Sequence, residues 1–260
     1  MKKLFVIVLA AIGMVSCMNT DEVIEVNNDN AIAFADAFIE NSVRAEINND
    51  NLENFEVWGW MQENTVEAPV FNAMEVTLSG ADWTYSPAQY WVPGFTYTFK
   101  ALSSNNATHP NWTAAVTTDG KLGEVEFTNI DGTEDLIYAA PAAVAAPALG
   151  TTAQPVELEF NHQLAKVKFD FEYAPELVAA LELSGLTVEA EEITMKVPGK
   201  ATIDYSATTP AWILDTTAAQ TTLEFAKEGV EKLTIPAGAA YEYEITFKVK
   251  YYQGDRKSVV

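Results

Sequence analysis

The sequence predicts an all-β protein, built as an antiparallel sandwich or a barrel-like fold. In residues 241–251, aromatic and aliphatic side chains occupy every odd position, and charged residues or threonine occupy the even ones. Such alternation gives a strand one apolar face, whereas in a helix it would scatter the apolar residues over all sides. Turn pairs such as Pro93-Gly94 and Asp119-Gly120 separate further alternating stretches. Many short strands with turns between them are typical of sandwiches and barrels.

The other strands are expected where shorter stretches show the same alternation. These stretches are 74–78, 95–99, 125–127, 156–160, 166–173, 223–225 and 233–235, and 55–60 is expected to be a strand with apolar residues on both faces. A helix is expected only at 175–183, because Pro175 stands where a first helical turn would begin and good helix formers follow it.

Composition and charge exclude several classes of function. Of the 260 residues, 48% are hydrophobic, which is enough for a packed core. Lys and Arg number 15 against 37 Asp and Glu, and the net charge of −22 repels phosphate backbones, so no nucleic-acid partner is expected. One cysteine rules out an internal disulfide, and two histidines leave little for a histidine-based metal or catalytic site. We therefore expect no enzyme, no metal and no cofactor.

The N-terminus has the features of a lipoprotein signal. Residues 1–16 begin with a basic pair and continue into an apolar run too short to span a bilayer as a mature helix. Residues 14–17 read Met-Val-Ser-Cys and resemble the bacterial lipobox, where the chain is cut before the cysteine and the thiol is acylated. We expect Cys17 to carry a lipid anchor. A plain secreted protein with an incidental cysteine is the alternative.

A change in composition suggests a division of the mature chain. No charged residue stands between Asp135 and Glu157, and Ala, Pro, Gly and Thr dominate that stretch. It is either a linker between two β domains or an irregular crossing within one. The expected organisation is a signal peptide at 1–16, an arm at 17–44, an N-terminal domain at 45–140, a linker at 141–155 and a C-terminal domain at 156–260.

Several short segments, taken in order, carry a family resemblance. They are Ile32-Ala33-Phe34, Val43-Arg44-Ala45, 55–60, 83–87, 90–94, 97–101, 135–139 and 160–167. Their order and spacing resemble the fimbrillin family, the pilins and pilus-associated surface lipoproteins of Bacteroides-like bacteria. The resemblance extends from the lipobox to about residue 173 and is weaker beyond it.

The resemblance implies two transthyretin-like antiparallel β-sandwich domains in tandem and assembly by strand exchange. In such a protein, lipidated Cys17 would hold the precursor in the outer membrane at the cell surface. An Arg-specific surface protease would then cut between Arg44 and Ala45 and release a strand that contains Ile32, Ala33 and Phe34. The groove left behind would accept a strand from another pilin subunit. The implied function is a structural or accessory subunit of an adhesive pilus.

The distribution of tryptophan leaves a second function open. Five of the six tryptophans lie in the N-terminal half, and exposed rings could stack on sugars in a non-polymerising, glycan-binding outer-membrane surface lipoprotein. A host glycan or protein is thus a further candidate partner. However, Trp58 and Trp60 lie on the opposite face of their strand from Phe55 and Val57. We therefore interpret these tryptophans as core or subunit-interface residues.

The remaining candidate features are weak. Adjacent acids such as Glu134-Asp135 are interpreted as solvated surface, and Asn129 with Asp131 only loosely matches the spacing of a calcium loop. At the C-terminus, a turn at 253–256 follows the strand at 241–251, and the return strand barely begins. We expect the second domain to be incomplete, in either a fragment or a variant that accepts a strand without donating one.

Overall fold

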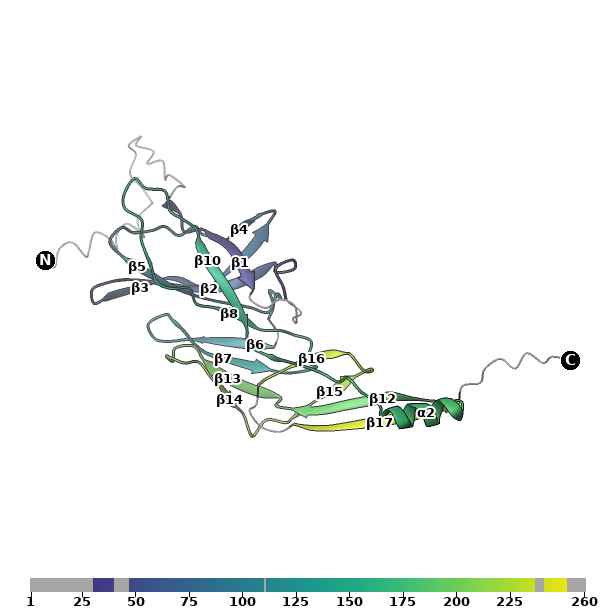
Figure 1. Cartoon of the computed structure of the whole chain (residues 1–260). Helices are drawn as coiled ribbons and strands as arrows, with labels where there is room; N and C mark the ends of the chain where they lie inside the picture. The colour runs from purple at the N-terminus through teal and green to yellow at the C-terminus, as the bar shows by residue number, and fades with distance from the viewer. Residues whose placement is uncertain (1–29, 40–46, 110, 237–240, 252–260) are drawn as a thin grey trace.

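The computed structural model describes residues 30–39, 47–109, 111–236 and 241–251 (Figure 1). Its strands are β1 (Phe34–Ile39), β2 (Asn54–Glu63), β3 (Val66–Ser79), β4 (Asp82–Thr84), β5 (Thr96–Ser103), β6 (Trp112–Val116), β7 (Leu122–Thr128), β8 (Ile137–Ala139), β9 (Val144–Ala145), β10 (Val156–His162), β11 (Ala165–Lys168), β12 (Leu186–Val197), β13 (Lys200–Asp204), β14 (Trp212–Leu214), β15 (Thr221–Phe225), β16 (Glu231–Thr234) and β17 (Glu242–Tyr251). One helix, α2 (Pro175–Leu183), is described. The predicted all-β class is confirmed, and α2 occupies the residues predicted for it.

One predicted strand is shorter than its sequence pattern. The alternation at 166–173 predicts eight extended residues, but β11 ends at Lys168. Its antiparallel partner β16 is only four residues long, so no ladder continues past that point. Phe169 and Phe171 instead pack as partly buried side chains against the core of a neighbouring sheet.

The largest sheet is curled, and β1 and β4 are its two ends. Its strand order is β1-β10-β8-β5-β2-β3-β4, with β9 added beside β5. The curl brings β1 and β4 into contact. The sheet thereby encloses an aromatic-rich core that includes Phe55, Phe71, Phe99 and Phe160.

A second sheet, of order β14-β13-β7-β6, lies against the other face of the curled sheet (Figure 1). Trp58 of β2 is fully buried in the core between the two sheets, with Leu122, Phe127 and Ile203. Phe55 on the same strand points into the first core. The prediction that this strand is buried on both faces is confirmed.

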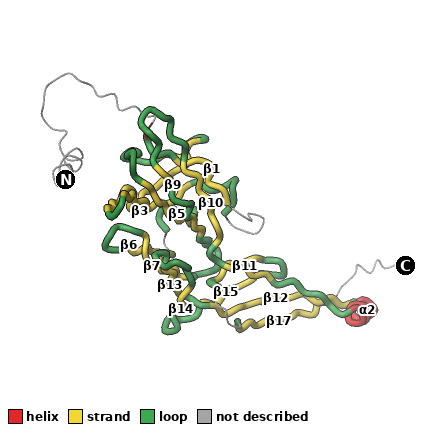
Figure 2. Tube along the Cα trace, turned by 60° about the vertical axis from the view of Figure 1, so that its left-hand side comes forward, coloured by secondary structure: helices red, strands yellow, loops and turns green. Residues whose placement is uncertain are grey.

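The C-terminal part of the chain forms smaller sheets. β11 pairs with β16, and β12 lies between β15 and β17. A small core of Ile193, Met195, Val197, Leu223 and Phe225 underlies the second of these sheets. The β12–β17 ribbon extends away from the rest of the molecule, with α2 at its far end (Figures 1 and 2).

Strands from both sides of the predicted linker share sheets. β10 pairs with β8, and β13 pairs with β7. Within residues 141–155, β9 adds to the edge of β5. The proposed division at 141–155 is therefore not a division between sheets, and independent folding of 45–140 and 156–260 as transthyretin-like units stays a prediction.

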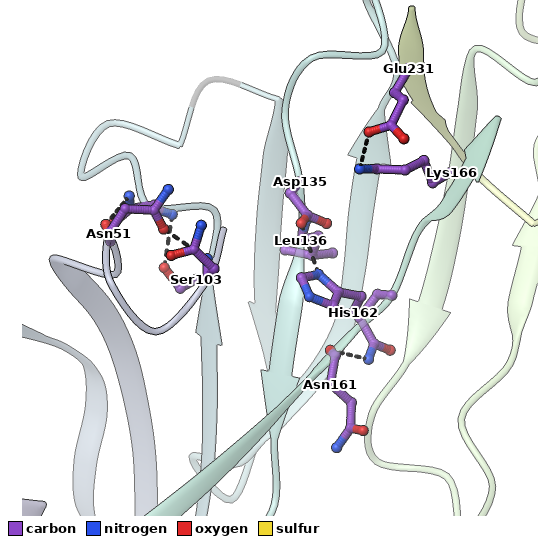
Figure 3. A network of polar contacts seen from close by, with 11 residues as sticks. Asn51, Ser103, Asp135, Leu136, Asn161, His162, Lys166 and Glu231 are labelled. Atoms are coloured by element: carbon purple, nitrogen blue, oxygen red, sulfur yellow. Dashed lines mark hydrogen bonds and ion pairs between the residues drawn. The ribbon is translucent and has the colours of Figure 1, made fainter. Parts of the chain in front are cut away.

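A buried polar contact joins β10 to the segment before β8 (Figure 3). The Asp135 side chain is buried, its Oδ2 lies 2.8 Å from Nδ1 of His162, and its Oδ1 accepts the backbone N–H of Leu136 at 2.8 Å. Asp135 is thus a structural residue, and the prediction that it lies on a solvated surface was wrong. His162 is packed in a strand, as the alternation around it predicts.

Gly59 allows the aromatic rings of the first core to approach β2. It lies opposite Phe71 of β3 and Phe99 of β5. A Cβ at this position would come within 2.9 Å of the Phe71 ring and 3.0 Å of the Phe99 ring. Close backbone approach therefore requires glycine here.

We predict that Gly59→Val lowers the free energy of unfolding by about 1–3 kcal/mol, because the added methyl groups overpack the core. Urea denaturation would measure the change, with the dependence of the unfolding free energy on urea concentration (the m-value) held equal for parent and variant. Gln62→Val, at an exposed position on the same strand, is the matched control and should change stability by less than about 0.5 kcal/mol. Equal effects of the two substitutions would contradict the packing described for Gly59.

Candidate functional site

The candidate site is the groove that holds residues 30–39. Ile32 and Phe34 point into the first core with 1% and 5% of their surface exposed, and Ile39 is 1% exposed. Ala33, between the first two, points outward. Of the predicted removable residues, the structure thus places Ile32 and Phe34 in the core and Ala33 at the surface, and β1 itself begins only at Phe34.

The ring of Phe34 occupies an aromatic cage. It contacts Phe55, Phe71, Tyr85 and Phe99 at centroid distances of 5.8, 5.6, 5.9 and 5.9 Å. All four contacts are edge-to-face, the arrangement that aromatic quadrupoles favour, and each such pair contributes about 0.5–1.5 kcal/mol beyond area burial. Phe34 is therefore the main anchor of this segment.

Backbone hydrogen bonds hold the segment from both sides. β1 runs parallel to β10, and Val156 donates to the carbonyl of Ala33 at 2.7 Å. On the other side, Ile32 donates to the carbonyl of Gln89 at 2.8 Å. The Tyr85 hydroxyl donates to the carbonyl of Ile32. Burial raises the pKa of Tyr85, so its hydroxyl keeps the proton that this bond requires.

β10 depends on β1 for most of its pairing. It meets β8 only at Asn161 and His162, whereas β1 pairs along Val156–Phe160. An open hollow of about 880 Å³, lined by residues that include Tyr138, Pro141 and Glu157, lies beside β10. Loss of β1 would therefore leave Val156–Phe160 without a neighbouring strand among the described residues.

The predicted lipidation and cleavage residues lie outside the described residues. Cys17 precedes the first described residue, and Arg44 and Ala45 lie in the gap between Ile39 and Ile47. Both flanking isoleucines belong to the first core. A cut between Arg44 and Ala45 would therefore leave β1 held to the rest of the chain by non-covalent contacts alone.

The other candidate residues do not form a site. All six tryptophans are described: four are buried, and Trp83 and Trp212 are partly buried, so none presents a fully exposed ring for sugar stacking. The Asn129 side chain bonds the backbone at Gly132 and Leu233, and Asp131 bonds Thr133. Within the described ranges, no cluster of three or more His, Cys, Asp or Glu residues could hold a metal ion. Nor is any helix there long and apolar enough to cross a bilayer.

We predict that Phe34→Ala lowers the free energy of unfolding by about 3–5 kcal/mol, because it empties the aromatic cage. Urea denaturation of the intact chain would measure the loss. Ala33→Ser, at the exposed neighbouring position, is the control, and its free energy of unfolding should stay within about 0.5 kcal/mol of the parent value. A Phe34→Ala change as small as that of the control would show that the cage does not hold β1.

Comparison with known proteins identifies the family of the chain. The model of the fimbrillin-like family matches residues 43–257. Similar solved structures include a candidate cell adhesion protein of Bacteroides thetaiotaomicron, with 18% identity, a TM-score of 0.40 and coverage of 84% of this chain and 80% of that one. A candidate cell adhesion protein of Bacteroides uniformis shows 14% identity, a TM-score of 0.45 and coverage of 84% and 78%. A candidate adhesin of Bacteroides ovatus shows 9% identity, a TM-score of 0.41 and coverage of 86% and 73%.

No curated protein matches the chain. The chain belongs to the fimbrillin-like family.

Proposed function

We propose that this chain is a structural or accessory subunit of an adhesive surface pilus, assembled by exchange of β1 for a strand of another subunit. The observation that carries the proposal is the position of β1. It lies at the edge of the curled sheet, yet it fills the centre of the first core through Phe34. A strand in such a place can leave without threading through the molecule, and another extended strand can enter from the side.

The energetics of the groove favour occupation by a strand. Removing β1 would expose the apolar groove and the backbone groups of β10 together. Burying Ile32, Phe34 and Ile39 at about 1.5–3 kcal/mol each offers roughly 5–9 kcal/mol before ordering costs. An incoming strand would regain this energy and satisfy the exposed backbone.

Export and processing would control when exchange occurs. In this proposal, lipidated Cys17 brings the precursor to the outer-membrane surface, and β1 keeps the groove occupied on the way. A surface protease then hydrolyses the bond between Arg44 and Ala45. Arg44 is the only basic residue between Lys3 and Lys100, so no other Arg or Lys in that stretch would compete for a trypsin-like enzyme.

We predict that cleavage after Arg44 permits exchange at the groove. The full chain carrying Cys17→Ser, which prevents lipidation, would be cut with an Arg-specific protease and mixed with a fluorescent peptide spanning residues 30–39. Anisotropy should report stable binding to the cut chain and none to the intact one. A peptide with alanine in place of Ile32 and Phe34 should bind roughly 100-fold more weakly or worse, because two buried side chains are lost.

Arg44→Ala is the matched control, since it should resist the cut at this position and exclude the peptide. A wild-type chain that is cut after Arg44 but excludes the peptide, even after mild heating, would contradict strand exchange. So would a chain that binds the wild-type and alanine peptides equally well.

A further inference from the structure

A second exposed strand edge lies far from β1, on the extended ribbon (Figures 1 and 2). β17 pairs with β12 on one side, and no described strand pairs with its other side. Its apolar face is unusually open, because Tyr243, Phe247 and Val249 are 65%, 46% and 58% exposed. A long, apolar and exposed edge strand is a template for pairing with another strand.

The charges of β17 are arranged to complement a second copy of the same strand. Glu242 and Glu244 stand near its start, Lys248 and Lys250 stand near its end, and Thr246 is midway between them. If two copies pair antiparallel about Thr246, each glutamate faces a lysine. In a parallel, in-register pair, like charges would face each other, which destabilises a sheet.

The apolar face obeys the same symmetry. Antiparallel pairing about Thr246 sets Tyr243 opposite Val249 and Ile245 opposite Phe247 of the second copy. Pairs of an aromatic with a β-branched residue are among the favourable cross-strand combinations. Both faces of β17 therefore select the same register.

Opposite charges already face each other between the antiparallel strands β12 and β17. β12 carries Glu189 and Lys196, which bind Lys250 and Glu242 of β17 respectively. A strand inside a sheet has a neighbour on each side, so charges that pair with β12 can also face charges of a strand on the outer edge. Occupation of that edge needs no rearrangement of the β12 pair.

We propose that β17 is a self-complementary docking edge, at which two copies of this chain join antiparallel about Thr246 and continue their sheets into one another. This contact uses neither β1 nor Arg44, so it is independent of strand exchange. It would link subunits side by side rather than through the groove.

Charge reversal tests the pairing in the full chain carrying Cys17→Ser. The parent should sediment as a dimer. Glu242→Lys with Glu244→Lys, or Lys248→Glu with Lys250→Glu, should weaken self-association by about tenfold or more, because like charges then face each other. An equimolar mixture of the two variants should dimerise again, which also shows that both are folded. Glu224→Lys, at an exposed position on β15 of the same sheet, is the control and should dimerise like the parent.

A single cysteine tests the register. Cys17→Ser leaves no other cysteine, so Thr246→Cys can form a disulfide only with a second copy. Mild oxidation should link Thr246→Cys chains, because the two positions 246 face each other. Glu244→Cys chains should stay unlinked, since the two positions 244 would be offset by four residues, or about 13 Å, beyond the reach of a disulfide.

Three results would overturn the proposal. The first is a parent chain that stays monomeric in sedimentation. The second is failure of the mixed charge variants to associate. The third is equal linking of Thr246→Cys and Glu244→Cys, which would indicate random collision.

Discussion

The burial of one ring, that of Phe34, holds the curled sheet closed. Its cage is formed by Phe55, Phe71, Tyr85 and Phe99, which come from or lie next to β2, β3, β4 and β5. Because β1 and β4 are the two ends of the sheet, contacts between them convert an open sheet into an enclosed core. The segment that completes this core is also an edge strand, held by a ladder on one side and by loop contacts around residues 89–91 on the other.

The two main cores respond differently to the loss of that segment. The first core contains Ile32, Phe34 and Ile39, whereas no described residue before β2 belongs to the core around Trp58. β2 contributes side chains to both cores, so the second sheet would still support it if β1 were removed. This arrangement explains how a subunit could give up a strand and still present an ordered groove, which the proposed exchange requires.

Local patterns in the sequence predicted much of the fold. Pro175 and the residues after it located the helix, and the position of Trp58 opposite Phe55 predicted a strand between two cores. The parallel pairing of β1 with β10 was not predictable, because about 120 residues separate the strands and no local pattern encodes that contact. The same holds for β7 beside β13, which joins the halves on either side of 141–155. Of the candidate site, the family resemblance indicated Ile32 and Phe34, but the cage around Phe34 depends on these long-range pairings.

Hydrogen exchange of β10 after removal of β1 tests most directly whether β1 is an exchangeable strand that completes this sheet. The chain would be cut after Arg44, its N-terminal fragment would be displaced, and amide protection would be compared with that of the intact chain by mass spectrometry. Protection should fall in Val156–Phe160, persist in β2 and β7, and return when a peptide of residues 30–39 is added. Unchanged protection of β10 would show that β1 does not complete this sheet. Loss of protection throughout the chain would show that β1 is an indispensable part of the core rather than an exchangeable strand.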